Sequence, residues 1–192
     1  MMSIALSYFP YYLRQPSIRI MLFVDGENLA IRYKEELGED EPLDHIHYQP
    51  DVYLWSGLLE LICAHAPVVR KHYYTSLQGD SNRIDSVVDK LKEVGIEVPR
   101  VFKKPKGRKS KRVDITLATE MLEHATRGNY DVAVLIAGDE DYVPLVEAVK
   151  GHGCRVHLWF FQSGLSPALR RSCDVFKDLR EVIFESDHNR IA

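Results

Sequence analysis

Five short apolar runs recur along this chain, each followed by a more polar segment. The runs are rich in β-branched and aromatic residues, and their continuous apolar character is typical of strands buried on both faces of a parallel sheet. They span residues 18–24, 68–75, 96–102, 132–136 and 155–161. Because these runs alternate with segments of helical length, the pattern predicts one three-layer α/β/α domain with a five-stranded, mainly parallel sheet.

Helical periodicity is clearest in the segment that follows the second run. Apolar residues recur there at helical spacing from Ile84 to Val94, and Gly95 ends the stripe. After the first run we expect a helix that begins at Leu29 and is capped by Asn28. Further helices are predicted at residues 51–62, at 113–125, around Pro144 and at 165–179.

The composition fits a globular protein with a single core. The chain has 192 residues, of which 45% are hydrophobic and 28% charged, as in ordinary globular domains. We expect an N-terminal extension at residues 1–17, the domain at 18–183 and a C-terminal tail at 184–192. No apolar run approaches the roughly 18 residues of a membrane span, and the three dispersed cysteines are typical of a reducing compartment. A cytoplasmic protein without a membrane partner is therefore predicted.

Acidic residues follow three of the predicted strands. Asp25 follows the first, Asp114 comes after the third, and Asp139 and Asp141 follow the fourth. Each could simply form a turn. If the first and fourth strands are neighbours where the strand order reverses, however, these acids line one crevice. Acids that converge without Arg or Lys partners need a hard cation, and carboxylate oxygens favour Mg²⁺ or Mn²⁺. Such an ion could activate water for attack on a phosphate.

A strongly basic segment follows the third predicted strand. Ten consecutive residues without an acid hold seven cations: Lys103, Lys104, Lys106, Arg108, Lys109, Lys111 and Arg112. Without these seven, the formal net charge of −3 would be −10. A solvated loop is the plain alternative, but a basic strip beside a cation-requiring acidic crevice is suited to binding a nucleic-acid backbone.

Three motifs, in order along the chain, resemble the NYN domain, a branch of the PIN-like nucleases. They read FVDGEN at residues 23–28, KRVDITLA at 111–118 and AGDEDYVPLV at 137–146. The resemblance extends over roughly residues 18 to 180. It implies a Rossmann-like sheet of strand order 3-2-1-4-5 and a divalent-metal nuclease that usually acts on RNA.

The resemblance also assigns residues to the site. Asp25, Asp114, Asp139 and Asp141 match the family's acidic, metal-holding positions, and Asn28 matches the asparagine of its first motif. We therefore expect a metal-dependent (endo)ribonuclease that uses Mg²⁺ or Mn²⁺, with RNA as partner, or else single-stranded DNA. Self-association is left open. The chain departs from many members, which have Asp, Ser, Ser and Phe at Glu120, Ala137, Glu140 and Tyr142, respectively.

Two alternatives compete with the nuclease interpretation. A haloacid-dehalogenase-like phosphohydrolase also uses an aspartate after its first strand, but it needs a second Asp two residues later, where this chain has Glu27. A nucleic-acid-binding module that keeps the fold and the acids but cleaves poorly is the other alternative. In that case the basic segment would carry the function.

Overall fold

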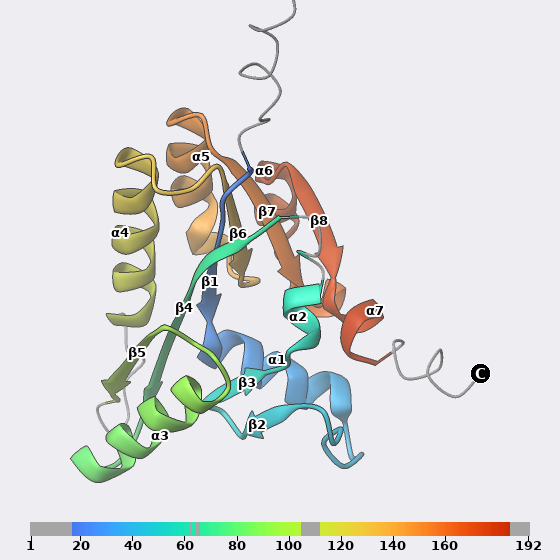
Figure 1. The fold of residues 1–192 in the computed structure, drawn as a ribbon. Coiled ribbons are helices and arrows are strands. Elements are labelled where there is room, and N and C mark those ends of the chain that lie inside the picture. The colour runs from blue at the N-terminus through green and yellow to red at the C-terminus, as the bar shows by residue number, and fades with distance from the viewer. Residues whose placement is uncertain (1–16, 62, 64–65, 105–111, 185–192) are drawn as a thin grey trace, which may run out of the picture.

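A six-stranded parallel sheet runs through the computed structural model, which describes residues 17–61, 63, 66–104 and 112–184 (Figure 1). The strand order is β5-β4-β1-β6-β7-β8, and every neighbouring pair is parallel. The predicted order 3-2-1-4-5 is confirmed by the first five of these strands, and β8 is added at the edge beside β7. The strands are β1 (Ile20–Asp25), β4 (Val68–Leu77), β5 (Val98–Lys103), β6 (Val132–Ile136), β7 (Arg155–Phe160) and β8 (Val175–Asp178).

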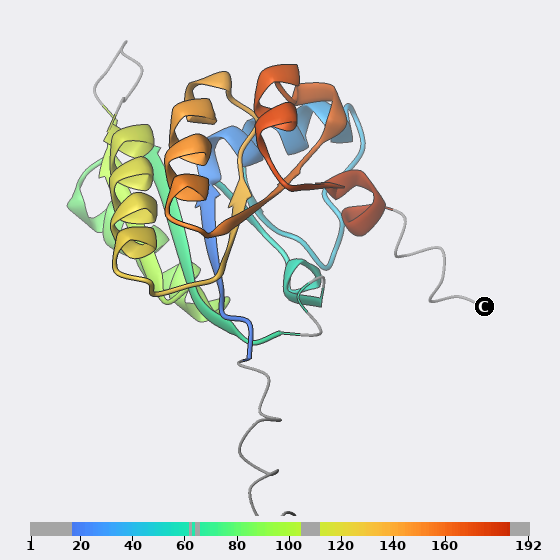
Figure 2. The ribbon, with the colours of Figure 1, turned by 90° about the horizontal axis from the view of Figure 1, so that it is seen from above.

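Helices cover both faces of the sheet, which confirms the three-layer α/β/α fold (Figure 2). One face packs against α1 (Gly26–Leu37), α2 (Leu58–Leu61), α3 (Ser81–Glu93) and α7 (Leu179–Ile183). The other packs against α4 (Arg112–Thr126), α5 (Val143–Gly151) and α6 (Pro167–Ser172). Two 3₁₀ turns, η2 (Glu140–Tyr142) and η3 (Gln162–Gly164), follow β6 and β7. No helix in the described ranges is both long and apolar enough to cross a membrane.

Alternation along β1 divides the core into two clusters. Leu22 and Val24 belong to the cluster beneath α1, whereas Met21 and Phe23 belong to the cluster beneath α4. Leu22, Phe23 and Val24 are completely buried, and each such side chain contributes roughly 1.5–3 kcal/mol through removal of apolar surface from water. The central strand that ends at Asp25 is therefore held from both sides.

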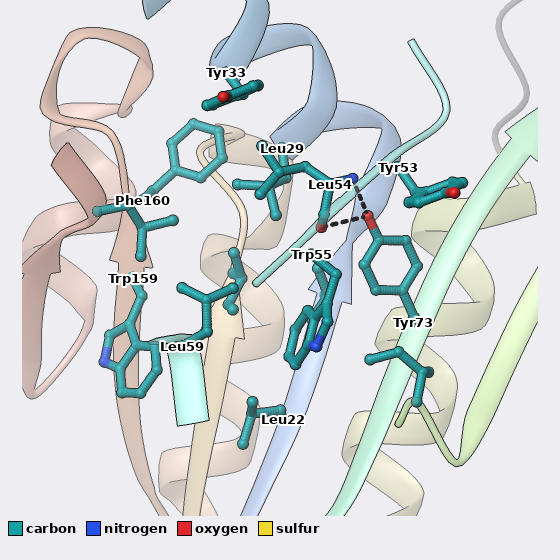
Figure 3. Close-up of a cluster of buried hydrophobic side chains, with 14 of the residues drawn as sticks. Leu22, Leu29, Tyr33, Tyr53, Leu54, Trp55, Leu59, Tyr73, Trp159 and Phe160 are labelled. Carbon is teal, nitrogen blue, oxygen red and sulfur yellow. Dashed lines mark hydrogen bonds between the residues drawn. The ribbon is translucent and has the colours of Figure 1, made fainter. Parts of the chain in front are cut away.

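Residues 51–62 were predicted to be a helix, and this prediction is wrong. They contribute β3 (Tyr53–Trp55), which pairs antiparallel with β2 (His47–Gln49), and then the short helix α2. The hydroxyl of Tyr73 donates to the carbonyl of Leu54 at 3.1 Å and accepts from its N–H at 3.0 Å (Figure 3). These bonds replace the helical partners of Leu54, and all three residues of β3 are buried, which a one-sided helix would not allow.

The predicted last helix, residues 165–179, is also wrong in its second half. The helix α6 ends at Ser172, and the chain then turns into the extended strand β8. Asp174 starts the new pairing, since its N–H donates to the carbonyl of Val156 at 2.9 Å and its carboxylate accepts from the N–H of Val156 at 2.8 Å. Pairing with the open edge of β7 satisfies backbone groups that would otherwise remain unpaired.

Candidate functional site

The site lies at the carboxyl edge of the sheet, where β1 is flanked by β4 on one side and β6 on the other. The chain passes from β1 to β4 and β5 and then crosses to β6, so the strand order reverses at β1. Ligands bind preferentially at such a reversal in open α/β sheets. A pocket of about 290 Å³ opens there. It is lined by Asp25, Glu27, Asn28, Ile31, Lys104, Val113, Asp114 and Asp139.

Asp25 ends β1 and caps α1. Its Oδ1 accepts from the N–H of Asn28 at 3.1 Å, so the helix begins at Gly26 and not at the predicted Leu29. Glycine is needed at residue 26 because a Cβ there would lie 1.9 Å from the ring of Tyr73. Burial, together with the charges of Asp114 and Glu27, raises the pKa of Asp25 to about 7, although the hydrogen bonds from Asn28 and Tyr142 act to lower it.

Tyr142 joins two of the predicted acids. Its buried hydroxyl lies 2.9 Å from Oδ2 of Asp25 and 3.3 Å from Oδ1 of Asp114. A phenol has one proton to donate, so both contacts are favourable together only when one of the carboxyl groups is itself protonated. Burial also raises the pKa of Asp114, and the charges of Asp139 and Asp141 add to the effect. The sequence marked Tyr142 only as a departure from the usual Phe, and its contact with the acids was not predicted.

Asn28 connects the first motif to the third. Its Oδ1 accepts from the N–H of Gly138 at 3.0 Å, which fixes the end of β6 beside the start of α1. A Cβ at residue 138 would lie 2.3 Å from the ring of Phe160 and 2.5 Å from the carbonyl oxygen of Gly164. Glycine is therefore required here by close packing. This arrangement sets the position of Asp139, which directly follows.

The three acids after Gly138 have different surroundings. Asp139 lines the pocket. Asp141 does not line it, although its charge helps to raise the pKa of Asp114. The extra acid of this chain, Glu140, accepts from the hydroxyl of Ser166 at 3.1 Å and so is directed toward the start of α6.

Two pocket residues form an ion pair that the sequence did not predict. The ammonium of Lys104 pairs with Oε1 of Glu27, and Oε2 of Glu27 accepts from the hydroxyl of Ser76 at 2.8 Å. Both charged side chains are largely buried, with 28% of Lys104 and 19% of Glu27 exposed. The sequence assigned Lys104 to nucleic-acid binding, and the structure places it inside the acidic pocket.

The other predicted cations are only partly described. Lys103 is exposed at the end of β5, and the guanidinium of Arg112 lies 4.8 Å from the ring centroid of Phe102. Lys106, Arg108, Lys109 and Lys111 lie outside the described residues. Their assignment to nucleic-acid binding stays a prediction.

Glu120, which stands where many NYN domains have Asp, belongs to a separate network. It accepts from the hydroxyl of Tyr74 at 2.8 Å and from Nε of Arg100 at 2.9 Å. The imidazole Nδ1 of His72 lies 3.2 Å from the same Tyr74 hydroxyl. Glu120 does not line the pocket, and its carboxylate is bound by Tyr74 and Arg100 instead.

The donor chemistry of the pocket fits a hard divalent cation, because its polar lining consists mainly of carboxylates. Burial is the largest cause of the raised pKa of Asp25, so a bound cation would offset the cost of ionising this acid. As they stand, however, no three His, Cys, Asp or Glu side chains in the described ranges are grouped closely enough to hold a metal ion. Binding would therefore require Tyr142 or Lys104 to release the carboxylates that they contact.

Comparison with known proteins supports the same fold. A crystal structure of a protein of unknown function from Vibrio parahaemolyticus superposes with a TM-score of 0.65 at 19% sequence identity, covering 87% of this chain and 96% of that one. No curated protein sequence matches the chain significantly. The sequence model of the NYN domain matches residues 19–180, which contain all three motifs and every residue that lines the pocket. This match sets aside the phosphohydrolase alternative, and the chain belongs to the NYN domain family, whose fold is of the PIN-like nuclease type.

Proposed function

We propose that this protein is a divalent-metal-dependent nuclease that hydrolyses phosphodiester bonds in single-stranded RNA. The observation that carries the proposal is the convergence of Asp25 and Asp114, from two different elements, on one buried hydroxyl beside Asp139 in a pocket at the strand-order reversal. Acids brought together in this way repel one another, and a bound cation would offset that repulsion.

Asp25, Asp114 and Asp139 would hold Mg²⁺ or Mn²⁺, with Asp141 contributing through its charge near Asp114. The bound ion would polarise the phosphate and activate the attacking water. Asn28 fixes the end of β6 against the start of α1 and so sets the distance between the acids of the first and third motifs. Val113 and Asp25 line the pocket and are themselves buried, so they would limit the access of bulk water on their side of the reaction.

Single-stranded RNA is the proposed substrate because the acids line a pocket and do not stand on a flat surface. An unpaired strand can bring one phosphate into such a pocket. Two pocket residues, Lys104 and Val113, lie near the two ends of the basic segment, so a nucleic-acid backbone that bound the segment at these ends would lie near the acids.

One observation favours a second candidate, a nucleic-acid-binding module with little or no cleavage. Both oxygens of Asp25 already accept hydrogen bonds, and Glu27 is neutralised by Lys104. If these contacts persist when nucleic acid binds, no ion enters and the protein only binds. Both candidates bind nucleic acid at the same pocket and basic segment, but only the nuclease binds a metal ion there.

One experiment separates them. End-labelled single-stranded RNA is incubated with the wild type, Asp25→Asn and the surface control Asp85→Asn, each with Mn²⁺ or with chelator. The nuclease proposal expects shortening only with Mn²⁺, by the wild type and the control alike. Binding without shortening in every lane would support the binding module, and shortening in chelator would contradict a metal-dependent reaction.

A further inference from the structure

The acidic pocket contains one cation of its own among the described residues, the ammonium of Lys104. The backbone N–H of Lys104 donates to the carbonyl of Leu77 at 2.8 Å, which fixes the residue to the end of β4. Its side chain then reaches Glu27 in the first turn of α1. The backbone of Lys104 is thus held in place, and its ammonium can change position only by rotation about the side-chain bonds.

Glu27 is electrostatically part of the acid group. It lies two residues after Asp25 and lines the same pocket, and its charge acts on both Asp25 and Asp114. The hydroxyl of Ser76 donates to the second oxygen of Glu27 at 2.8 Å, a contact that does not depend on Lys104. The position beside Glu27 is therefore one that different cations could occupy in turn.

We propose that Lys104 is a tethered counter-ion, held by Glu27 in the free protein and transferred to a phosphate of the bound nucleic acid when a divalent ion occupies the pocket. This inference rests on the proposed function and deepens it. Lys104 and a divalent ion are attracted by the same carboxylates and repel each other, so the lysine weakens metal binding until a phosphate accepts it. A lysine has four rotatable side-chain bonds and donates to phosphate as a point charge, which suits such a transfer.

The transfer makes metal and nucleic acid each favour the binding of the other. When a phosphate holds Lys104, the uncompensated charge of Glu27 attracts the ion to the neighbouring Asp25 and Asp114, and when the ion is bound, Lys104 is repelled from Glu27 and is available to the phosphate. By linkage the two affinities must increase by the same factor. A purely structural ion pair between β5 and α1 would produce no such coupling.

The test is Mn²⁺ titration by calorimetry on the full chain without nucleic acid. Lys104→Met should bind Mn²⁺ about tenfold more tightly than wild type, whereas Glu27→Gln should bind it more weakly. Lys104→Arg keeps the charge and should resemble wild type. The matched control is the exposed pair Lys90–Glu93 on α3, whose Lys90→Met and Glu93→Gln variants should leave Mn²⁺ affinity unchanged. Thermal melts in chelator establish that each variant is folded.

A second titration measures the coupling with a cleavage-resistant 2′-O-methyl oligoribonucleotide. Saturating oligonucleotide should increase the Mn²⁺ affinity of wild type severalfold more than that of Lys104→Met. If wild type binds Mn²⁺ but Lys104→Met binds it no more tightly, this inference is overturned and the proposed function stands. If wild type binds no Mn²⁺ with or without the oligonucleotide, the proposed function fails and the inference fails with it.

Discussion

The hydroxyl of Tyr142 lies 2.9 Å from Oδ2 of Asp25, although the two residues are 117 positions apart in the chain. Asp25 ends β1, and Tyr142 ends the 3₁₀ turn after the neighbouring strand β6. The bond therefore connects the carboxyl ends of these two strands at the point where the strand order reverses. The same hydroxyl lies 3.3 Å from Oδ1 of Asp114, a residue of α4, the helix that follows the basic segment. All three sequence motifs therefore meet at one phenol oxygen.

Removing this hydroxyl should weaken the metal-free protein. Tyr142→Phe preserves the ring in the core but leaves Oδ2 of Asp25 without its buried donor, so we expect a loss of about 1–3 kcal/mol in the free energy of unfolding. Urea denaturation in chelator measures it. Tyr130→Phe is the matched control, because it also removes a buried phenol bond, to the carbonyl of Met121 at 2.9 Å, away from the acids.

The two tyrosine variants should differ in their response to Mn²⁺. Tyr142→Phe no longer has a donor that competes for Asp25 and Asp114, so its stability should increase more on addition of Mn²⁺ than that of Tyr130→Phe. Equal increases in the two variants would show that the Tyr142 hydroxyl does not compete with the ion.

Asp25 should make the metal-free protein less stable as the pH rises. Its pKa is about 7 in the folded protein, chiefly through burial, against 3.8 for an ordinary aspartate. Because the folded pKa is the higher one, the contribution of the protonated acid is fully present below pH 3.8 and is lost as the pH rises through 7. The pH-dependent change in the free energy of unfolding is at most about 4 kcal/mol, at 1.36 kcal/mol per pKa unit. Asp25→Asn should therefore be more stable than wild type at pH 8 in chelator.

The measurement is the urea midpoint of wild type and Asp25→Asn at pH 5 and pH 8. The difference between the two proteins should grow with pH, and Asp85→Asn should follow wild type at both values. A constant difference would mean that Asp25 is ionised throughout and that another cation already neutralises it.

Much of this fold could be predicted because its central strands are uninterrupted apolar runs. The five residues of β6 are all buried. A run that is apolar at every position is typical of a central strand that is covered by helices on both faces of the sheet. By contrast, β8 has only four residues and none of them is buried, so nothing in its composition distinguishes it from the end of a helix. The run at Val52–Trp55 is apolar but short, and short apolar runs fit a strand or a helix equally well.

The site divides in the same way. The strand-end positions of Asp25 and Asp139 follow from sequence alone, because parallel strands end at a common edge. The pairing of Lys104 with Glu27 joins residues 77 positions apart and depends on how the ends of β4 and β5 lie against α1. Local sequence carries no signal for such a contact. The role of Tyr142 depends likewise on the direction in which one side chain points.

His72 should produce the opposite pH dependence from Asp25. It is buried, its ring stacks on Phe23 at 5.1 Å, and burial lowers its pKa to about 4. Between pH 6.5 and pH 4 the unfolded chain binds a proton that the folded protein does not, so stability falls as the pH decreases through this range. His72→Phe should lack that part of the decline, on the order of 2–3 kcal/mol. Urea midpoints of wild type and His72→Phe at pH 7 and pH 4.5 measure this. An equal decrease in the midpoints of the two proteins between these pH values would contradict the prediction.

Nucleic-acid binding should depend on salt in proportion to the cations that contact phosphates. If about four residues of the basic segment engage a single strand, the log–log slope of affinity against salt should be near −3, from about −0.7 per phosphate. Replacing Lys106, Arg108 and Lys109 with Ala should flatten the slope and weaken binding to all sequences alike. Fluorescence anisotropy at several salt concentrations measures this. An unchanged slope would place the strand elsewhere on the protein.

The acids after Gly138 should differ in their effect on cleavage, because only Asp139 lines the pocket. Asp139→Asn should reduce the rate by at least roughly two orders of magnitude, as expected when one preorganised charge at a reacting phosphate is lost. Asp141→Asn should cost less, since Asp141 acts on Asp114 through its charge alone. Glu140→Gln should change the rate little, because the carboxylate of Glu140 is directed toward Ser166.

Single-turnover cleavage of labelled RNA with Mn²⁺, at equal folded fraction, gives the three rates. Equal losses in all three variants would mean that net charge and not position controls the reaction, and the assignment of Asp139 to the metal would then be wrong.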